Sequence, residues 1–123
     1  MSQQAPAVVG IAALAVDCDD PPELAGWWSR LLGGTVEVDE DGDATLHTLH
    51  TPDGLHIDFV RVPDERTVKN RLHLDLRSTD LDEATRQAEA LGATRADDIY
   101  DGGRWQVMRD PEGNEFCILR PRS

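Results

Sequence analysis

Two short stretches of this sequence place chemically active side chains at every second position. In residues 72–77 these are His73, Asp75 and Arg77, and in residues 55–59 they are His56 and Asp58. Because successive side chains of a β-strand point to opposite faces, each stretch predicts a strand with one packed and one polar face. Arg77 could bind a substrate carboxylate or phosphate, or pair with Asp75. His73 could bind a ligand, or its imidazole could form a hydrogen bond with Asp58 or Asp75.

Further candidates lie elsewhere in the chain. Residues 115–119 alternate in the same way, with Phe116 and Ile118 predicted to pack against a helix and Cys117 on the opposite face. Cys117 is either a small buried apolar residue or a reactive thiolate. Trp105 could stack on a planar ligand, or be an aromatic residue of the core or rim. His47 and His50 differ by three positions, so they should face opposite sides of a strand.

An internal repeat arranges these stretches. Asp20 with Glu23, and Asp80 with Glu83, have the spacing of a capping box and predict two helix starts. The first predicted helix carries a broad apolar stripe that includes Trp27 and Trp28, and it ends at Gly33-Gly34. The sequences TPDG (residues 51–54) and DPEG (residues 110–113) then mark equivalent turns before a closing strand.

The repeat predicts an α+β domain of residues 1–123, built from two βαβββ modules at about residues 7–63 and 70–121. Neither module can bury its helix and sheet alone. We therefore expect the two sheets to combine into one curved, barrel-like mixed wall, with the helices outside and a cleft inside. The apolar run of residues 11–16 predicts a strand that is covered on both faces.

Composition restricts the class of partner. With 12 basic and 24 acidic residues the net charge is −12, which disfavours nucleic acids and anionic membranes. The apolar run of residues 5–16 is shorter than the roughly 20 residues of a membrane span and lacks the basic start of a signal peptide. The two cysteines can form at most one disulfide. We expect a cytoplasmic protein that acts on a small molecule or another protein.

Three segments carry a resemblance to a known family. They are DCDDPPELAGWW (residues 17–28), KNRLHLDL (residues 69–76) and DPEGNEFCILRP (residues 110–121). Together they resemble the vicinal oxygen chelate superfamily of glyoxalases, bleomycin-resistance proteins and dioxygenases, and most of all its glyoxalase-like domain proteins. The resemblance extends over nearly the whole chain and implies the paired-module fold.

The resemblance also implies a ligand set for a divalent metal ion. The family's four ligand positions fall on Ala13, Asp58, His73 and Cys117. Alanine cannot bind a metal, and a thiolate is unusual among the family's His, Glu and Gln ligands. The remaining three donors could hold zinc with water in a fourth position; nickel, manganese and iron are the other candidates. A single histidine in the set disfavours an extradiol dioxygenase, whose iron needs two.

Two functions from different classes remain open. One is a metal-dependent lyase or isomerase that uses Asp58, His73 and Cys117 on a small oxygenated substrate, with His56, Asp75, Arg77 and Trp105 as substrate-binding residues. The other is a metal-free protein that binds or sequesters a hydrophobic or cationic compound, as bleomycin-resistance relatives do. Ala13 favours the second function, and His73 with its polar strand face favours the first. The resemblance further implies a homodimer.

Overall fold

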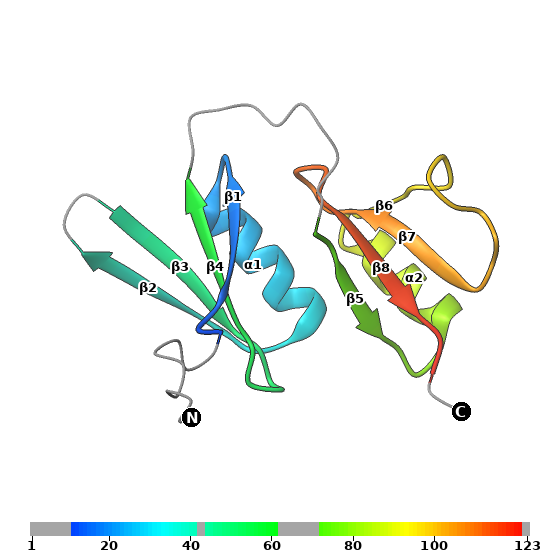
Figure 1. The fold of residues 1–123 in the computed structure, drawn as a ribbon, viewed down its shortest axis with the longest axis horizontal. Helices are drawn as coiled ribbons and strands as arrows, with labels where there is room; N and C mark the ends of the chain where they lie inside the picture. Colours follow the sequence, from blue (N-terminus) through cyan, green and yellow to red (C-terminus); the bar gives the residue numbers. More distant parts are fainter. Residues whose placement is uncertain (1–10, 42–43, 62–71, 122–123) are drawn as a thin grey trace, which may run out of the picture.

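The computed structural model describes residues 11–41, 44–61 and 72–121, which form two βαβββ modules (Figure 1). The first module contains β1 (Leu14–Cys18), α1 (Pro21–Leu32), β2 (Thr35–Asp41), β3 (Ala44–His50) and β4 (His56–Arg61). The second contains β5 (Leu74–Arg77), α2 (Leu81–Ala90), β6 (Thr94–Arg95), β7 (Trp105–Arg109) and β8 (Glu115–Leu119). The predicted α+β class is confirmed.

The two sheets have the same strand order. It is β1-β4-β3-β2 in the first and β5-β8-β7-β6 in the second. In each sheet the opening and closing strands run parallel, and the remaining neighbours are antiparallel. The two Pro-Gly turns precede β4 and β8, where Gly54 and Gly113 donate to Thr51 and Asp110 over 3.0 and 2.9 Å. The internal repeat of the sequence is therefore a repeat of structure.

Both helices begin where the sequence predicts. The side chain of Asp20 accepts a hydrogen bond from the Glu23 amide at 3.3 Å, and that of Asp80 accepts one from the Glu83 amide at 3.1 Å. These bonds satisfy amides that the first turn of a helix leaves without an internal partner. Helix α1 ends at Gly33, whose φ of 82° suits glycine. No helix of the described residues is long and apolar enough to cross a membrane.

Helix α1 packs against both modules, and Figure 1 shows it between the first sheet and β5. The rings of Trp27 and Trp28 meet Phe116 of β8 edge-to-face, at centroid distances of 6.0 and 4.9 Å. The Trp27 indole also donates to the Leu91 carbonyl at 2.8 Å, at the end of α2. One buried cluster therefore contains core residues of both sheets. The apolar stripe of α1 is broad because it serves two sheets.

The turn before β8 fastens the second module to the start of α1. Buried Asp110 accepts hydrogen bonds from the Trp28 indole at 3.0 Å and from the Asn114 amide at 2.9 Å. In the same turn, the Glu112 carboxylate accepts from the amides of Asp19 and Asp20 at 2.8 and 3.1 Å. These contacts join residues that are far apart in the chain and fix how the modules sit on each other.

Two expectations about how the sheets are arranged and covered need correction. The described strands form two separate curved sheets instead of one common wall, and α1 lies between them. The prediction that residues 11–16 are covered on both faces is wrong for the single chain, since Ile11 is 86% exposed and Ala15 is exposed. The reason is packing: both sheets turn their apolar faces to the core around α1. Each polar face consequently lies on the side of its sheet away from that core.

Candidate metal centre

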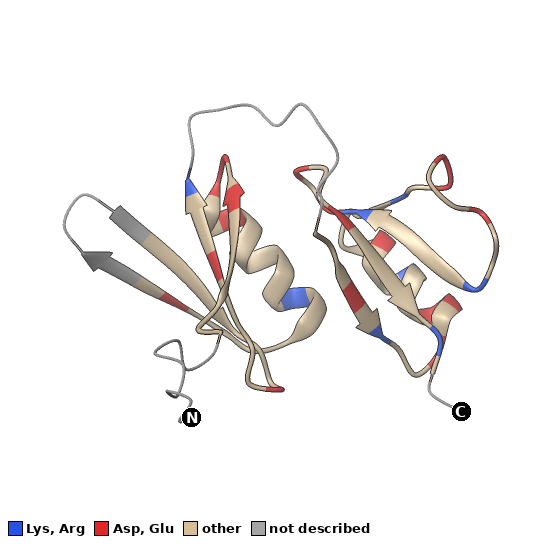
Figure 2. Cartoon of the chain, viewed as in Figure 1, with Lys and Arg blue, Asp and Glu red and all other residues tan. Residues whose placement is uncertain are grey.

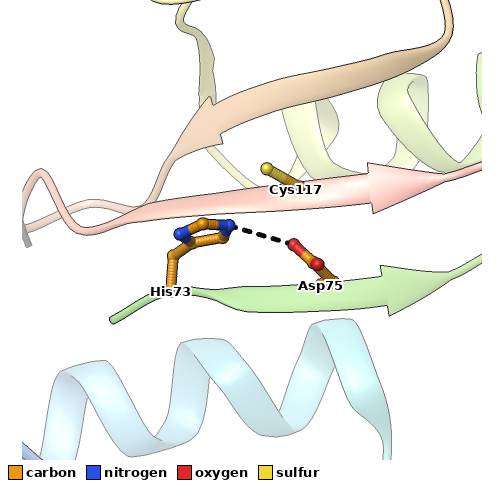
Figure 3. A group of neighbouring side chains, drawn as sticks. All are labelled: His73, Asp75 and Cys117. Carbon is orange, nitrogen blue, oxygen red and sulfur yellow. Dashed lines mark ion pairs between the residues drawn. The ribbon is translucent and has the colours of Figure 1, made fainter. Parts of the chain in front are cut away.

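Three potential metal ligands meet on the polar face of the second sheet (Figure 3). Among the described residues, one group of three or more His, Cys, Asp or Glu side chains has its ligand atoms within 4.8 Å of one another: His73, Asp75 and Cys117. Within it, Nε2 of His73 lies 3.1 Å from Oδ1 of Asp75. The group combines a nitrogen, an oxygen and a sulfur donor.

Strand register explains why these residues meet. Asp75 of β5 is the direct partner of Cys117 in the parallel β8, so both side chains point to the same face. His73 comes two residues before Asp75 and shares that face. The alternate residues Leu74 and Phe116 point the other way, into the interior between sheet and helices. The same alternation that builds the core therefore gathers the donors.

The geometry and the chemistry of the group fit zinc. Ligand atoms around a tetrahedral zinc lie roughly 3.3–3.8 Å apart, because the bonds are about 2.0–2.3 Å long. The side chains of His73 and Asp75 are 40% and 53% exposed, so small side-chain rotations can bring their ligand atoms to the distances that zinc requires. Cys117 is only 7% exposed and is packed with apolar Ala96 and Val107.

The other predicted ligand of the first module lies on a different sheet. Asp58 is on β4, where its carboxylate accepts a hydrogen bond from the Thr48 hydroxyl at 2.6 Å. Within the described chain it does not belong to the group of His73. Ala13, half-buried, lies just before β1, the strand in which Ala15 pairs with Asp58. The single chain thus presents the four family positions on two separate polar faces.

The first polar face carries histidines of its own. The rings of His50 and His56 meet edge-to-face with centroids 4.5 Å apart, and Nε2 of His50 lies 3.1 Å from a Glu37 carboxylate oxygen. His56 shares the face with Asp58, as the alternation predicted. His47 faces the opposite side, beside Phe59 in the register of β3 and β4.

The remaining predicted residues lie beside the donor group. Arg77 donates through Nη1 to the Arg120 carbonyl at 2.8 Å instead of pairing with Asp75. Trp105 stacks on Tyr100, with ring centroids 4.0 Å apart and planes 6° from parallel. Sequence reasoning placed Asp75 among the substrate-binding residues, but in the structure it is the carboxylate nearest to His73. Its place two residues after His73 was the signal for that role.

The second cysteine has a different environment. Burial, and to a smaller extent the nearby carboxylates of Glu112 and Asp19, together raise the pKa of the Cys18 thiol from its ordinary value of 9.0 to about 12. Its thiol therefore stays protonated at neutral pH. Cys18 packs in the main core and is 4% exposed, so it serves packing and not metal binding.

Comparison with known proteins identifies the family. Residues 13–119, nearly the whole chain, match the family described as the glyoxalase-like domain. The chain therefore belongs to the glyoxalase-like domain family, and its fold is that of the glyoxalase/bleomycin resistance/dioxygenase, or vicinal oxygen chelate, superfamily. The resemblance seen in the three sequence segments is confirmed. A search of curated protein sequences finds no match.

Solved structures with the same fold have low sequence identity. The fosfomycin resistance protein FosX from Listeria monocytogenes is 16% identical with a TM-score of 0.70, over 94% of this chain and 93% of that one. A superfamily member from Sphaerobacter thermophilus is 18% identical with a TM-score of 0.70, over 92% and 98%. An E126Q mutant of the Listeria protein was solved with Mn(II) and 1S,2S-dihydroxypropylphosphonic acid; it is 14% identical with a TM-score of 0.69, over 94% and 92%. These similarities establish the shared fold.

Proposed function

We propose that this protein is a metal-dependent enzyme of the lyase or isomerase type that acts on a small oxygen-bearing substrate. The observation that carries the proposal is the convergence of His73, Asp75 and Cys117 on one polar strand face. Three donors of different kinds, one just before β5, one on β5 and one on β8, leave coordination positions open for substrate oxygens. The Mn(II)-bound FosX structure, which shares the fold, supports a metal in this superfamily.

The donor set favours zinc over the harder metals. A thiolate and an imidazole suit zinc, whereas manganese prefers oxygen ligands. Bound there, the ion would supply Lewis-acid polarisation of a substrate oxygen or acidify a water molecule. Asp75, 3.1 Å from His73, either binds the ion or holds the imidazole in the orientation that binding needs. Arg77 places a positive charge beside the group and draws an anionic substrate towards it.

A second copy of the chain would complete the site. Asp58 lies on the first sheet, and its polar face points away from the core that both sheets share. The exposed Ile11 and Ala15 leave one face of the apolar β1 segment uncovered in the single chain. We infer a homodimer in which the first sheet of one chain faces the second sheet of its partner. Asp58 would then join His73 and Cys117 of the other chain, and β1 would gain its missing cover.

Metal analysis tests the centre directly. Protein purified without a histidine tag or chelator should contain about one zinc per chain, measured by mass spectrometry of the elements. His73→Ala should lose the zinc, whereas the control His50→Gln, which is not one of the predicted ligands, should retain it. Retention of stoichiometric metal by His73→Ala would place the ion elsewhere and refute the proposed centre.

Mixing variants tests the shared site. Asp58→Ala and His73→Ala each damage one half of every site in a homodimer. Unfolding and refolding the two variants together should yield mixed dimers that contain one intact site, and zinc binding should partly return. If the site lies within one chain, mixing restores nothing. Light scattering of the unmixed protein gives the oligomeric state independently.

Metal-free binding is the alternative function. Ala13 removes one family ligand, and Cys117 packs with apolar Ala96 and Val107 in a small buried cluster. In that case the polar face would bind or sequester a compound directly, and the ion pair of His73 with Asp75 would need no metal. Ligand binding that is unchanged by EDTA and by Cys117→Ser would favour this function over the enzyme.

A further inference from the structure

The candidate metal centre borders an aromatic platform on the same sheet face. Cys117 is a member of the donor group, and it also belongs to a small buried cluster with Ala96 and Val107, separate from the main core. Two stacked rings, Tyr100 and Trp105, pack against this cluster. Any molecule that binds at the sulfur therefore lies next to aromatic surface.

Strand pairing orders this face from polar to apolar. In one row Asp75 is followed by Cys117 and Val107, and in the next row Arg77 is followed by Leu119 and Trp105. Trp105 is one strand and two residues away from Cys117. With strands about 4.8 Å apart and a rise of about 3.3 Å per residue, the backbone positions of the two residues are about 8 Å apart. Because both side chains stand on the same face, the ring of a small ligand bound at the sulfur can reach the indole of Trp105.

The loop that carries the platform is held in place by several side chains. Arg109 binds Asp98 through two hydrogen bonds of 3.0 and 2.8 Å, and Gln106 donates to Asp97 at 3.0 Å. Arg120 donates to the Gly103 carbonyl at 2.7 Å. A platform that is fixed before binding loses little entropy when a ligand stacks on it.

Gly102 shows how closely this loop packs on the ring of Tyr100. A Cβ atom at position 102 would collide with the Tyr100 hydroxyl and ring carbons. Tyr100 and Trp105 cover one face of each other, and both remain only half-buried. Aromatic surface therefore stays accessible beside the donor group.

We propose that Trp105, supported by Tyr100, determines specificity for a planar aromatic group, so that the substrate class is a small aromatic acid with neighbouring oxygen donors. The oxygens would bind at the group of His73 and Cys117, and the ring would lie on Trp105. Arg77 is in the same row as Trp105 and places a positive charge that favours the carboxylate of the acid. Figure 2 shows that basic residues lie mainly near strand ends. This inference rests on the proposed function, since it concerns the ligand of the same site.

Two α-keto acids with the same head group provide the test. Phenylglyoxylate carries a phenyl ring where pyruvate carries a methyl group. In calorimetric titrations of the zinc-loaded protein, phenylglyoxylate should bind about tenfold more tightly, as expected for one aromatic stacking contact. Trp105→Leu should abolish the difference and leave pyruvate binding within about twofold, and Trp105→Phe should largely preserve it. Equal affinities in the unmodified protein, no binding of either acid, or a preference that survives Trp105→Leu would overturn the proposal.

A second measurement follows ligand binding in the unmodified protein and uses a variant only to assign one signal. The chain has three tryptophans, and Trp27 and Trp28 are only 2% and 4% exposed, so their indole NMR signals serve as internal controls. The Trp105 signal, identified by its loss in Trp105→Phe, should show a ring-current shift with phenylglyoxylate and not with pyruvate. An unmoved Trp105 signal at saturation would refute the platform.

Repeating the titrations in EDTA separates this inference from the proposed function. A ring preference that persists without metal would support the platform and refute the metal centre. Metal-dependent binding of both acids with no ring preference would support the metal centre and refute the platform.

Discussion

Asp110 should be one of the most destabilising positions to change outside the apolar core. Its carboxylate is 5% exposed and accepts hydrogen bonds from the Trp28 indole, the Asn114 side chain and the amides of Glu112 and Asn114. Asp110→Ala would leave these donors without their acceptor. Each such loss costs about 1–3 kcal/mol, but water can reach the neighbouring turn and recover part of it. We therefore expect a loss of about 3–4 kcal/mol in the free energy of unfolding.

Urea unfolding followed by circular dichroism measures this loss. With a denaturant slope of about 1.5 kcal/mol per M, the midpoint should fall by roughly 2 M. Trp28→Phe removes only the indole donor and should cost about 1–2 kcal/mol, including some lost packing. A double-mutant cycle of the two changes should show a clear coupling energy, because the side chains are in direct contact.

Glu112→Gln is the control for this prediction. Glu112 lies in the same turn, but its bonds to the amides of Asp19 and Asp20 are exposed, and an amide oxygen can still accept one of them. Its cost should be below about 1 kcal/mol. If Asp110→Ala is no more destabilising than Glu112→Gln, or if the cycle shows no coupling with Trp28, the claim that this carboxylate joins the two modules is refuted.

Three further predictions concern other parts of the fold. Gly34→Ala should destabilise the protein by about 2–4 kcal/mol in thermal or urea unfolding, because its φ is +94° and a Cβ would collide with a backbone carbonyl of β3. The control Gly54→Ala, with φ +92° and open space around it, should cost only about 1 kcal/mol. Equal costs for the two substitutions would refute the collision. Phe116→Ala should cost about 3–5 kcal/mol, since the ring packs on both tryptophans of α1, and a loss below about 1 kcal/mol would contradict that packing. Cys18 should resist alkylation at pH 8 in the native protein and react once urea unfolds the chain, because its pKa is raised to about 12, mainly by burial. The same shift predicts that the free energy of unfolding falls as the pH rises from about 9 towards 12, where only the unfolded thiol ionises. Rapid alkylation of Cys18 in the native protein, followed by mass spectrometry, would contradict both expectations.

The sequence determined the elements and their order because those signals are local. Capping residues Asp20 and Asp80 set the helix starts, and the alternation in residues 72–77 and 115–119 set which side chains share a face. The repeat of these patterns was sufficient to predict two βαβββ modules, and the family assignment followed from the same segments. The period of a strand was sufficient to predict that His73 and Asp75 share one face, and that Cys117 lies on the face of its strand away from the core.

The tertiary structure decided how the two modules face each other, which no local pattern contains. Trp27 and Trp28 were predicted as part of the apolar stripe of a helix, and in the structure their indoles also donate hydrogen bonds to Leu91 and Asp110 of the second module. Because that packing places α1 between the sheets, Asp58 and His73 lie on separate polar faces within one chain. Side-chain period fixes a residue's face on its own sheet, but only the sum of long-range contacts fixes which sheet that face meets.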